Sequence, residues 1–272
     1  MVTLVLGGSG QLGQHLKGED TILTYNHNPT EGVRLSMDDW VEVEDLIIKL
    51  RPSVVINAAA YTDVDGCESE RGKCMRVNGE AVRHVARACR VVKSFLVQVS
   101  TDYVFDGQKG YYREEDEPNP INYYGLSKLI GESYALSHDL SLVVRTSGVF
   151  SAKKPNFPAV VMEKLSKGEE VVGAETFYSP IHAAQLASAI KELVRLRRTG
   201  IIHVAGPRIS RYELALMIAR KLGIDTSLVR KDSPNFSARR PKDSSLDSKR
   251  ASGKLKTSLS LDLGIEKLAR GE

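Results

Sequence analysis

Short apolar runs alternate with amphipathic segments along the first half of the chain. The apolar runs end in glycine, asparagine or hydroxyl residues, as buried parallel strands do, and they span residues 2–6, 21–25, 54–60, 95–99 and 140–145. Between them, residues 40–50 and 70–90 carry apolar side chains at helical spacing. Strand and helix therefore alternate, which predicts an α/β fold with a Rossmann-like, doubly wound parallel sheet.

The second half has a weaker pattern. Residues 183–196 and 212–222 carry apolar side chains on one helical face, and residues 201–205 read as a strand that returns to the main sheet. The rest of this half reads as a basic tail, since much of the excess of Lys and Arg lies in residues 230–256. A solvated basic flank explains that tail better than a polyanion site.

A glycine-rich turn follows the first predicted strand at once, in the order Gly7-Gly8-Ser9-Gly10-Gln11-Leu12-Gly13. Small residues there let the backbone approach a phosphate closely, and the N–H groups of the following helix face the anion. The turn therefore predicts a dinucleotide site, with a tight strand-to-helix turn as the alternative.

The second predicted strand ends in Asn26-His27-Asn28, where enzymes that use NAD often carry a carboxylate for the ribose 2′-hydroxyl. No carboxylate stands there to repel a 2′-phosphate, and Arg34 follows close by. The sequence favours NADP as the cofactor, with NAD as the alternative. His27 is read as an exposed loop residue.

Small and hydroxyl residues follow the next two predicted strands. Ala58-Ala59-Ala60 and Tyr61 come after the first, and Ser100-Thr101-Asp102 after the second. Ligands bind at the carboxyl ends of parallel strands, so these residues are candidates to line the site. Asn78, inside a predicted helix, is read as a helix-to-loop hydrogen-bonding residue.

Tyr124 and Lys128 lie four residues apart at the start of another predicted helix, so they share one face. A nearby ammonium favours the phenolate and would lower the barrier to proton transfer from the tyrosine. The spacing alone is common on surface helices, and its meaning depends on the rest of the chain.

Composition narrows the class of protein. The 272 residues are 42% hydrophobic and 26% charged, with a net charge of +4, as in a soluble protein that binds neither membrane nor nucleic acid. The three cysteines, Cys67, Cys74 and Cys89, lack metal-ligand spacing, so we expect free thiols, a cytoplasmic protein and no metal site.

The motifs together resemble the extended short-chain dehydrogenase/reductase superfamily and, more narrowly, the dTDP-4-dehydrorhamnose reductases, which carry out the last reduction in dTDP-L-rhamnose synthesis. The most specific match is Val99-Ser100-Thr101-Asp102-Tyr103-Val104-Phe105-Asp106-Gly107. The resemblance extends in order over nearly the whole chain through the glycine turn, residues 57–62, Tyr124–Lys128, Arg145-Thr146-Ser147, Asn156-Phe157, Ser179-Pro180, residues 200–206 and residues 240–246.

The resemblance implies an NAD(P)H-dependent oxidoreductase that reduces the C4 keto group of a nucleotide sugar. Thr101 matches the hydroxyl that holds the carbonyl oxygen, Tyr124 the proton donor, and Lys128 the residue that binds the nicotinamide ribose and lowers the tyrosine pKa. Cofactor contacts are expected from Gly7, Ser9, Gly10, Gln11, Leu12, Gly13, Asn26, Ala58, Ala59, Ala60, Tyr61, Ser100, Tyr124 and Lys128. Substrate contacts are expected from Asp102, Tyr103, Val104, Phe105, Asn156 and Arg240.

The resemblance also implies two parts. Residues 1–148, completed by about 179–206, would form the NAD(P)-binding Rossmann domain, and residues 149–178 and 207–272 a smaller substrate-binding lobe. Arg239, Arg240 and Lys242 would meet a pyrophosphate or remain solvated at the surface. The partner is a nucleotide-sugar substrate, and a homodimer is one candidate assembly.

Two departures concern the sugar nucleotide. The family usually has a tryptophan that packs on the nucleotide sugar where this chain has Gly148, and its Asp-Gln-x-Gly-x-Pro-Thr stretch appears here as residues 175–181. Phe177 or Tyr178 would stack on a base or pack in the core. Two alternatives follow: another nucleotide-sugar reductase or epimerase, or a non-catalytic NADP-binding regulatory subunit. The intact set of Thr101, Tyr124 and Lys128 argues against the latter.

Overall fold

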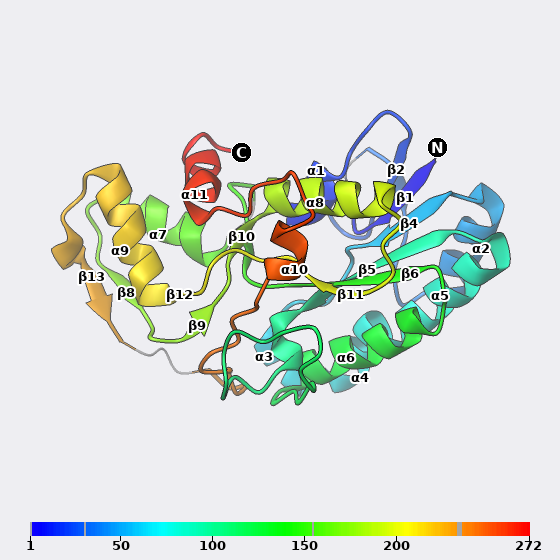
Figure 1. Ribbon diagram of the computed structural model, residues 1–272, viewed down its shortest axis with the longest axis horizontal. Coiled ribbons are helices and arrows are strands. Elements are labelled where there is room, and N and C mark those ends of the chain that lie inside the picture. Colours follow the sequence, from blue (N-terminus) through cyan, green and yellow to red (C-terminus); the bar gives the residue numbers. More distant parts are fainter. Residues whose placement is uncertain (1, 30, 154, 233–235) are drawn as a thin grey trace.

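The structure is a computed structural model that describes residues 2–29, 31–153, 155–232 and 236–272 (Figure 1). Met1 and residues 233–235 of the predicted basic tail therefore lie outside the described residues. Within the described ranges, no helix is long and apolar enough to cross a membrane.

A seven-stranded sheet with parallel pairing throughout forms the larger part of the molecule, in the order β11-β6-β5-β4-β1-β2-β3. This arrangement confirms the predicted Rossmann-like fold. The outer strand β11 shows that the predicted strand at 201–205 does return to the main sheet. The strands are β1 (Thr3–Leu6), β2 (Thr21–Tyr25), β3 (Val33–Arg34), β4 (Val54–Asn57), β5 (Phe95–Thr101), β6 (Ser141–Thr146) and β11 (Gly200–His203).

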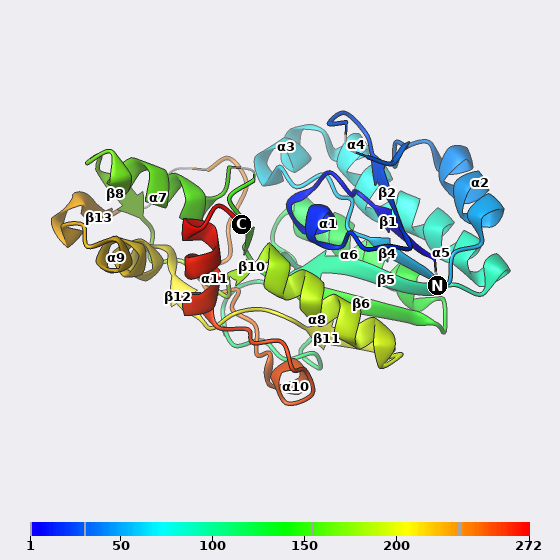
Figure 2. The same ribbon diagram turned by 90° about the horizontal axis from the view of Figure 1, so that it is seen from above.

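Helices cover both faces of this sheet (Figure 2). On one face, α1 (Gln11–His15) and α8 (Ala183–Arg195) pack on the strands through side chains such as Leu12 and Leu186. On the other, α2 (Trp40–Leu50), α5 (Ala81–Val92) and α6 (Tyr123–Leu136) form a second apolar layer. Both layers are required because every central strand is buried on both sides.

The helix predicted over residues 70–90 is not regular. It consists of α4 (Arg71–Met75), a π-helical segment Arg76–Glu80 and α5, and it follows the short α3 (Val64–Ser69). π-Helical turns are uncommon and often occur at functional sites. This one carries Asn78, which is 1% exposed and points toward the loop after β4.

A second apolar core lies beyond the carboxyl ends of the strands, at the left of Figures 1 and 2. The two helices predicted for the second half are confirmed as α8 and α9 (Arg211–Leu222). The basic-tail prediction missed the other elements here, because their strands have only two or three residues each. The elements are β7 (Val149–Phe150), α7 (Phe157–Ser166), β8 (Val171–Gly173), β9 (Phe177–Tyr178), β10 (Ile181–His182), β12 (Ile209–Ser210), α9, a 3-10 turn (Thr226–Leu228), β13 (Val229–Lys231) and α11 (Leu261–Ala269). The short α10 (Lys249–Ser252) lies instead beside β11, and its Ala251 packs in the core of the main sheet.

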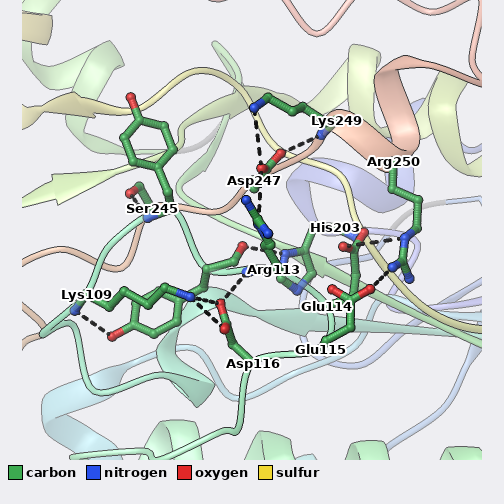
Figure 3. Close-up of polar contacts among 12 residues, drawn as sticks. Lys109, Arg113, Glu114, Glu115, Asp116, His203, Ser245, Asp247, Lys249 and Arg250 are labelled. Carbon is green, nitrogen blue, oxygen red and sulfur yellow. Dashed lines mark hydrogen bonds and ion pairs between the residues drawn. The ribbon is translucent and has the colours of Figure 1, made fainter.

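The long loop between β5 and α6 is tied to the C-terminal segment (Figure 3). Tyr112 forms a bridge with Leu246, its N–H donates to the Ser245 carbonyl at 2.8 Å, and its carbonyl accepts from Asp247 N at 2.8 Å. Arg250 pairs with Glu114 and Glu115 of the same loop. These contacts fix the segment that carries Arg240 and Ser244 beside the end of β5.

Candidate active site

Two cavities open beyond the carboxyl ends of the central strands, and they meet at the same four residues. One has a volume of about 360 Å³ and the other about 390 Å³. Both are lined by Thr62, Thr101, Tyr124 and Gly148. A molecule in either cavity would therefore contact the hydroxyls of Thr101 and Tyr124. We call the first the lobe cavity and the second the glycine-turn cavity.

Tyr124 is set in place by the start of α6. Asn122 caps the helix by accepting from Gly125 N at 2.8 Å. Gly125 is required because a Cβ there would lie 2.1 Å from the Tyr103 carbonyl oxygen. Burial raises the pKa of Tyr124, and a hydrogen bond with Thr101 opposes that rise. The phenol consequently keeps its proton at neutral pH.

Lys128 lies one turn further along α6 and is 3% exposed. Its Nζ donates to the Val99 carbonyl at 2.7 Å. Burial lowers the pKa of Lys128 to about 8, although the Glu132 carboxylate acts in the opposite direction. Desolvation is the largest influence on the pKa of Tyr124, and the Lys128 ammonium is bonded to the strand. The lowering of the tyrosine pKa by Lys128 therefore stays a prediction.

Asp102 holds three hydroxyl groups at the end of β5. Thr101 Oγ1 donates to one carboxylate oxygen at 3.1 Å, while Ser147 Oγ and Ser244 Oγ donate to the other at 2.8 Å and 2.5 Å. Burial raises the pKa of Asp102, and these three donors oppose it. Asp102 lines the lobe cavity as predicted for a substrate contact, but its hydrogen bonds position Thr101 and join the two halves of the chain.

The glycine-turn cavity has the features that a dinucleotide needs. Gly10, Gln11, Leu12, Ala58, Ala60, Ser100 and Lys128 line it, as the sequence predicts for cofactor contacts. Ser100 Oγ and Thr146 Oγ1 are buried there without a hydrogen-bond partner in the described chain, so a ligand can supply one. These orphaned hydroxyls and the small side chains fit a nicotinamide dinucleotide.

Gly7 and Gly13 shape the turn from behind. A Cβ on Gly13 would lie 2.3 Å from the Gly7 carbonyl oxygen, and one on Gly7 would lie 2.7 Å from the backbone of Ala59. Gly7 also has φ of +82°, which favours glycine. Their role in the fold is therefore close packing of the turn against β1 and β4, which leaves Ser9 and Gly10 at its tip.

Four other predicted cofactor residues lie outside the lining of this cavity: Ser9, Asn26, Ala59 and Tyr61. Asn26 Nδ2 donates to Ser36 Oγ at 3.1 Å. The Tyr61 hydroxyl donates to Glu70 at 2.5 Å, and Ala59 packs against Gly7. The backbone of Tyr61 bonds to the Asn78 amide at 2.8 Å and 3.0 Å, which confirms the helix-to-loop role predicted for Asn78.

The predicted substrate residues divide into two groups. Tyr103 and Arg240 line the lobe cavity, where Arg240 pairs with Asp65 at 2.8 Å. Val104 and Phe105 are fully buried in a small core, so the expected substrate contact by these side chains is wrong. A short 3-10 turn (Asp102–Val104) follows β5 and directs these two side chains into that core. The sequence pattern after the strand does not reveal this turn.

Asn156 also lies away from the lobe cavity. It caps α7 by accepting from Ala159 N at 3.0 Å, and its Nδ2 donates to Gln11 Oε1 at 3.1 Å. Its contacts therefore join the lobe to the glycine turn. The lobe cavity contains residues that the sequence analysis did not select, because they come from distant segments: Thr62, Val64, Ala174, Thr176, Arg211, Phe236, Pro241 and Ser244.

Gly148 and Tyr178 face each other across the lobe cavity wall. A Cβ on Gly148 would lie 2.5 Å from Tyr178 Cε2, and Gly148 has φ of +49°. Tyr178 is 7% exposed, belongs to the lobe core and also lines the cavity. The Arg208 guanidinium lies over the Phe177 ring, 3.5 Å from the ring centre. Core packing of Tyr178 is therefore confirmed, and its stacking on a base stays a prediction.

Comparison with known proteins identifies the family. Residues 1–262 match the model described as the RmlD substrate binding domain. The chain is 35% identical to a dTDP-4-dehydrorhamnose reductase of Streptomyces griseus, over 91% of this chain and 86% of the relative.

Solved structures agree. A hypothetical dTDP-4-dehydrorhamnose reductase from Sulfolobus tokodaii is 51% identical with a TM-score of 0.91, over 96% of this chain and 97% of that one. The dTDP-4-dehydrorhamnose reductase of Bacillus anthracis, solved in complex with NADP, is 30% identical with a TM-score of 0.88, over 99% and 98%. The chain thus belongs to the dTDP-4-dehydrorhamnose reductase family.

Proposed function

We propose that the protein uses NADPH to reduce the C4 keto group of dTDP-4-dehydro-L-rhamnose to dTDP-L-rhamnose. The observation that carries this proposal is the meeting of the two cavities at Thr101 and Tyr124. A cofactor in the glycine-turn cavity and a keto sugar in the lobe cavity would share these two hydroxyls. Relatives of this chain are named dTDP-4-dehydrorhamnose reductase, and one of them has the same overall fold.

The cavity residues divide the chemistry between them. When bound, NADPH supplies a hydride to the carbonyl carbon. Tyr124 gives its proton to the carbonyl oxygen as negative charge develops there, and its raised pKa keeps that proton in place until then. Asp102 fixes the position of Thr101, whose single hydroxyl proton would turn from the Asp102 carboxylate to the carbonyl oxygen when the sugar binds.

NADPH is the cofactor that the glycine-turn cavity supports best. The Bacillus anthracis relative was solved with NADP. β2 ends at Tyr25 and Asn26 follows it, with no carboxylate beside the place expected for a 2′-phosphate. Ser9, Gly10, Gln11 and Leu12 would contact the phosphates, while Ser100 and Lys128 would bind the nicotinamide ribose.

The two parts of the chain would divide binding accordingly. Residues 1–148, completed by about 179–206, would hold the cofactor, and residues 149–178 and 207–272 the sugar nucleotide. Cys67, Cys74 and Cys89 are buried free thiols, which suits the reducing cytosol in which we place the protein.

A second candidate is the reduction of a different nucleotide-linked keto sugar, favoured by Tyr178 in the wall beside Gly148. The purified protein should be assayed for NADPH oxidation with dTDP-4-dehydro-L-rhamnose and with a panel of other nucleotide-linked 4-keto sugars. Turnover with the first supports the proposal, and turnover with another alone supports the second candidate. Tight NADPH binding without turnover of any substrate would refute both.

A further inference from the structure

Arg211 presents an uncompensated positive charge to the lobe cavity. It is the first residue of α9 and is half-buried in the cavity lining. Its guanidinium lies 4.8 Å from the ring centre of Tyr178 and 5.1 Å from that of Phe157. Within the described chain it forms no ion pair with a carboxylate, and its side-chain hydrogen bond is to Tyr103. A guanidinium held between rings in a cavity is an anion-binding group.

The other arginine in the cavity lining is in a different state. Arg240 pairs with Asp65 at 2.8 Å, so an acidic group already balances its charge. The neighbouring Arg208 pairs with Asp243 at 2.8 Å. Arg211 is therefore the lining arginine whose charge remains for a ligand.

Gly148 makes this arrangement possible. The ring of Tyr178 occupies the space above Gly148, where any side chain would collide with it. The same ring provides a flat face for the Arg211 guanidinium. Because Tyr178 is packed into the lobe core, Arg211 is held in one position and loses little side-chain entropy on binding.

The charge of the proposed substrate matches this site. A nucleotide-linked sugar carries a diphosphate next to the sugar, and the Tyr103 ring joins Arg211 to the reaction centre, since it lies 6.0 Å from the Tyr124 ring. Arginine suits bidentate contact with phosphate oxygens. We propose that Arg211 binds the diphosphate of the nucleotide sugar, and that Tyr178, admitted by Gly148, positions it. This inference rests on the proposed function for the identity of the substrate.

Binding measurements without turnover test it. The Kd values of dTDP, thymidine and NADPH should be measured for the wild type, Arg211→Gln, Arg211→Lys and Tyr178→Ala. We expect Arg211→Gln to weaken dTDP binding about tenfold to a hundredfold, with thymidine and NADPH unchanged. Arg211→Lys should lose less affinity for dTDP than Arg211→Gln does. Tyr178→Ala should weaken the binding of dTDP but not that of thymidine or NADPH. The exposed Arg220 of the same helix gives the matched control Arg220→Gln, which should bind all three ligands as the wild type does.

An unchanged dTDP affinity in Arg211→Gln would overturn the inference, even if the wild type reduces the keto sugar. Conversely, a wild type that turns over no keto sugar would overturn the proposed function. The dTDP Kd of the wild type and of Arg211→Gln would still decide whether Arg211 binds the diphosphate. If Arg211→Gln does not fold, the wild type can be modified with phenylglyoxal and mapped by peptide mass. We expect dTDP, but not thymidine, to protect Arg211, and equal modification with and without dTDP would refute its role.

Discussion

Gly148 and Tyr178 occupy one space between them, since a Cβ on Gly148 would lie 2.5 Å from Tyr178 Cε2. The family that this chain resembles usually has a tryptophan at the position of Gly148 and, in its Asp-Gln-x-Gly-x-Pro-Thr stretch, a glycine at the position of Tyr178, so this chain has the two sizes exchanged. An aromatic surface is therefore present in the lobe cavity although residue 148 provides none. This surface comes from Tyr178 on β9, a different strand from the one that follows Gly148.

Gly148→Ala should therefore damage both stability and substrate binding. The new methyl group collides with the Tyr178 ring, and φ of +49° is unfavourable for alanine. We expect a loss of about 1–3 kcal/mol in the free energy of unfolding, together with a raised KM for the nucleotide sugar. Denaturant unfolding and steady-state kinetics measure the two effects.

The double variant Gly148→Ala/Tyr178→Ala separates the collision from the backbone strain. Removal of the Tyr178 ring relieves the collision but not the backbone strain. Tyr178→Ala should therefore lower the free energy of unfolding less in the Gly148→Ala variant than in the wild type. Additive stability losses would show that the two residues do not compete for space.

Tyr124→Phe should abolish turnover while cofactor binding remains. The phenylalanine keeps the ring but has no proton to give, so kcat should fall about a hundredfold to ten-thousandfold. The NADPH Kd, measured by fluorescence titration, should stay near the wild-type value. Tyr123→Phe, one residue earlier on α6, is the matched control and should keep wild-type activity. A Tyr124→Phe variant that remains fully active would exclude Tyr124 as the proton donor.

Local spacing explains what the sequence analysis could predict. The glycine turn and the Tyr124/Lys128 pair are set by one strand-to-helix junction or one helix, so their positions follow from a few neighbouring residues. The state of Lys128 did not follow, because its pKa depends on burial against β5. Arg211 was missed for the same reason, since an unpaired charge is visible only once every neighbouring carboxylate has been placed.

The lobe was predicted least well. Its strand pairs have two or three residues, which is too short for an alternating pattern to emerge, and its core is assembled from residues 150–178 and 209–268. Asp102 illustrates the consequence for the site. Its neighbours Ser147 and Ser244 lie 45 and 142 residues away in the chain, so only the folded structure shows that it fixes Thr101.

Glu132→Gln should destabilise the protein strongly. Glu132 and Arg145 form an ion pair at 2.7 Å, and each side chain is 2% exposed. Loss of the carboxylate leaves the guanidinium charged and buried, at a cost of about 3–5 kcal/mol in the free energy of unfolding. Glu163→Gln, which breaks an exposed pair with Lys167, is the control and should cost less than about 1 kcal/mol.

Replacement of both partners tests the reason for that loss. The variant Glu132→Leu/Arg145→Met removes both charges and should recover most of the stability lost by Glu132→Gln. If the double variant is as unstable as the single one, packing of these side chains rather than an unpaired charge explains the loss.

The pKa of Lys128 predicts how stability depends on pH. Burial lowers it from 10.5 to about 8, so between these values the unfolded chain binds a proton that the folded protein does not. The free energy of unfolding should therefore gain a favourable contribution as pH rises from about 8 to 10.5, and Lys128→Met should lack it. Equal pH dependence of the two proteins in denaturant unfolding would contradict this assignment.

The same pKa predicts a loss of activity at alkaline pH. If the Lys128 ammonium binds the nicotinamide ribose, it must be protonated to donate all of its hydrogen bonds, and kcat/KM for NADPH should fall as pH rises through about 8. Arginine keeps its charge in this range, so in Lys128→Arg the fall should move to higher pH, even if the maximal rate is lower. A profile for Lys128→Arg that falls at the same pH as the wild type would assign the titration to another group.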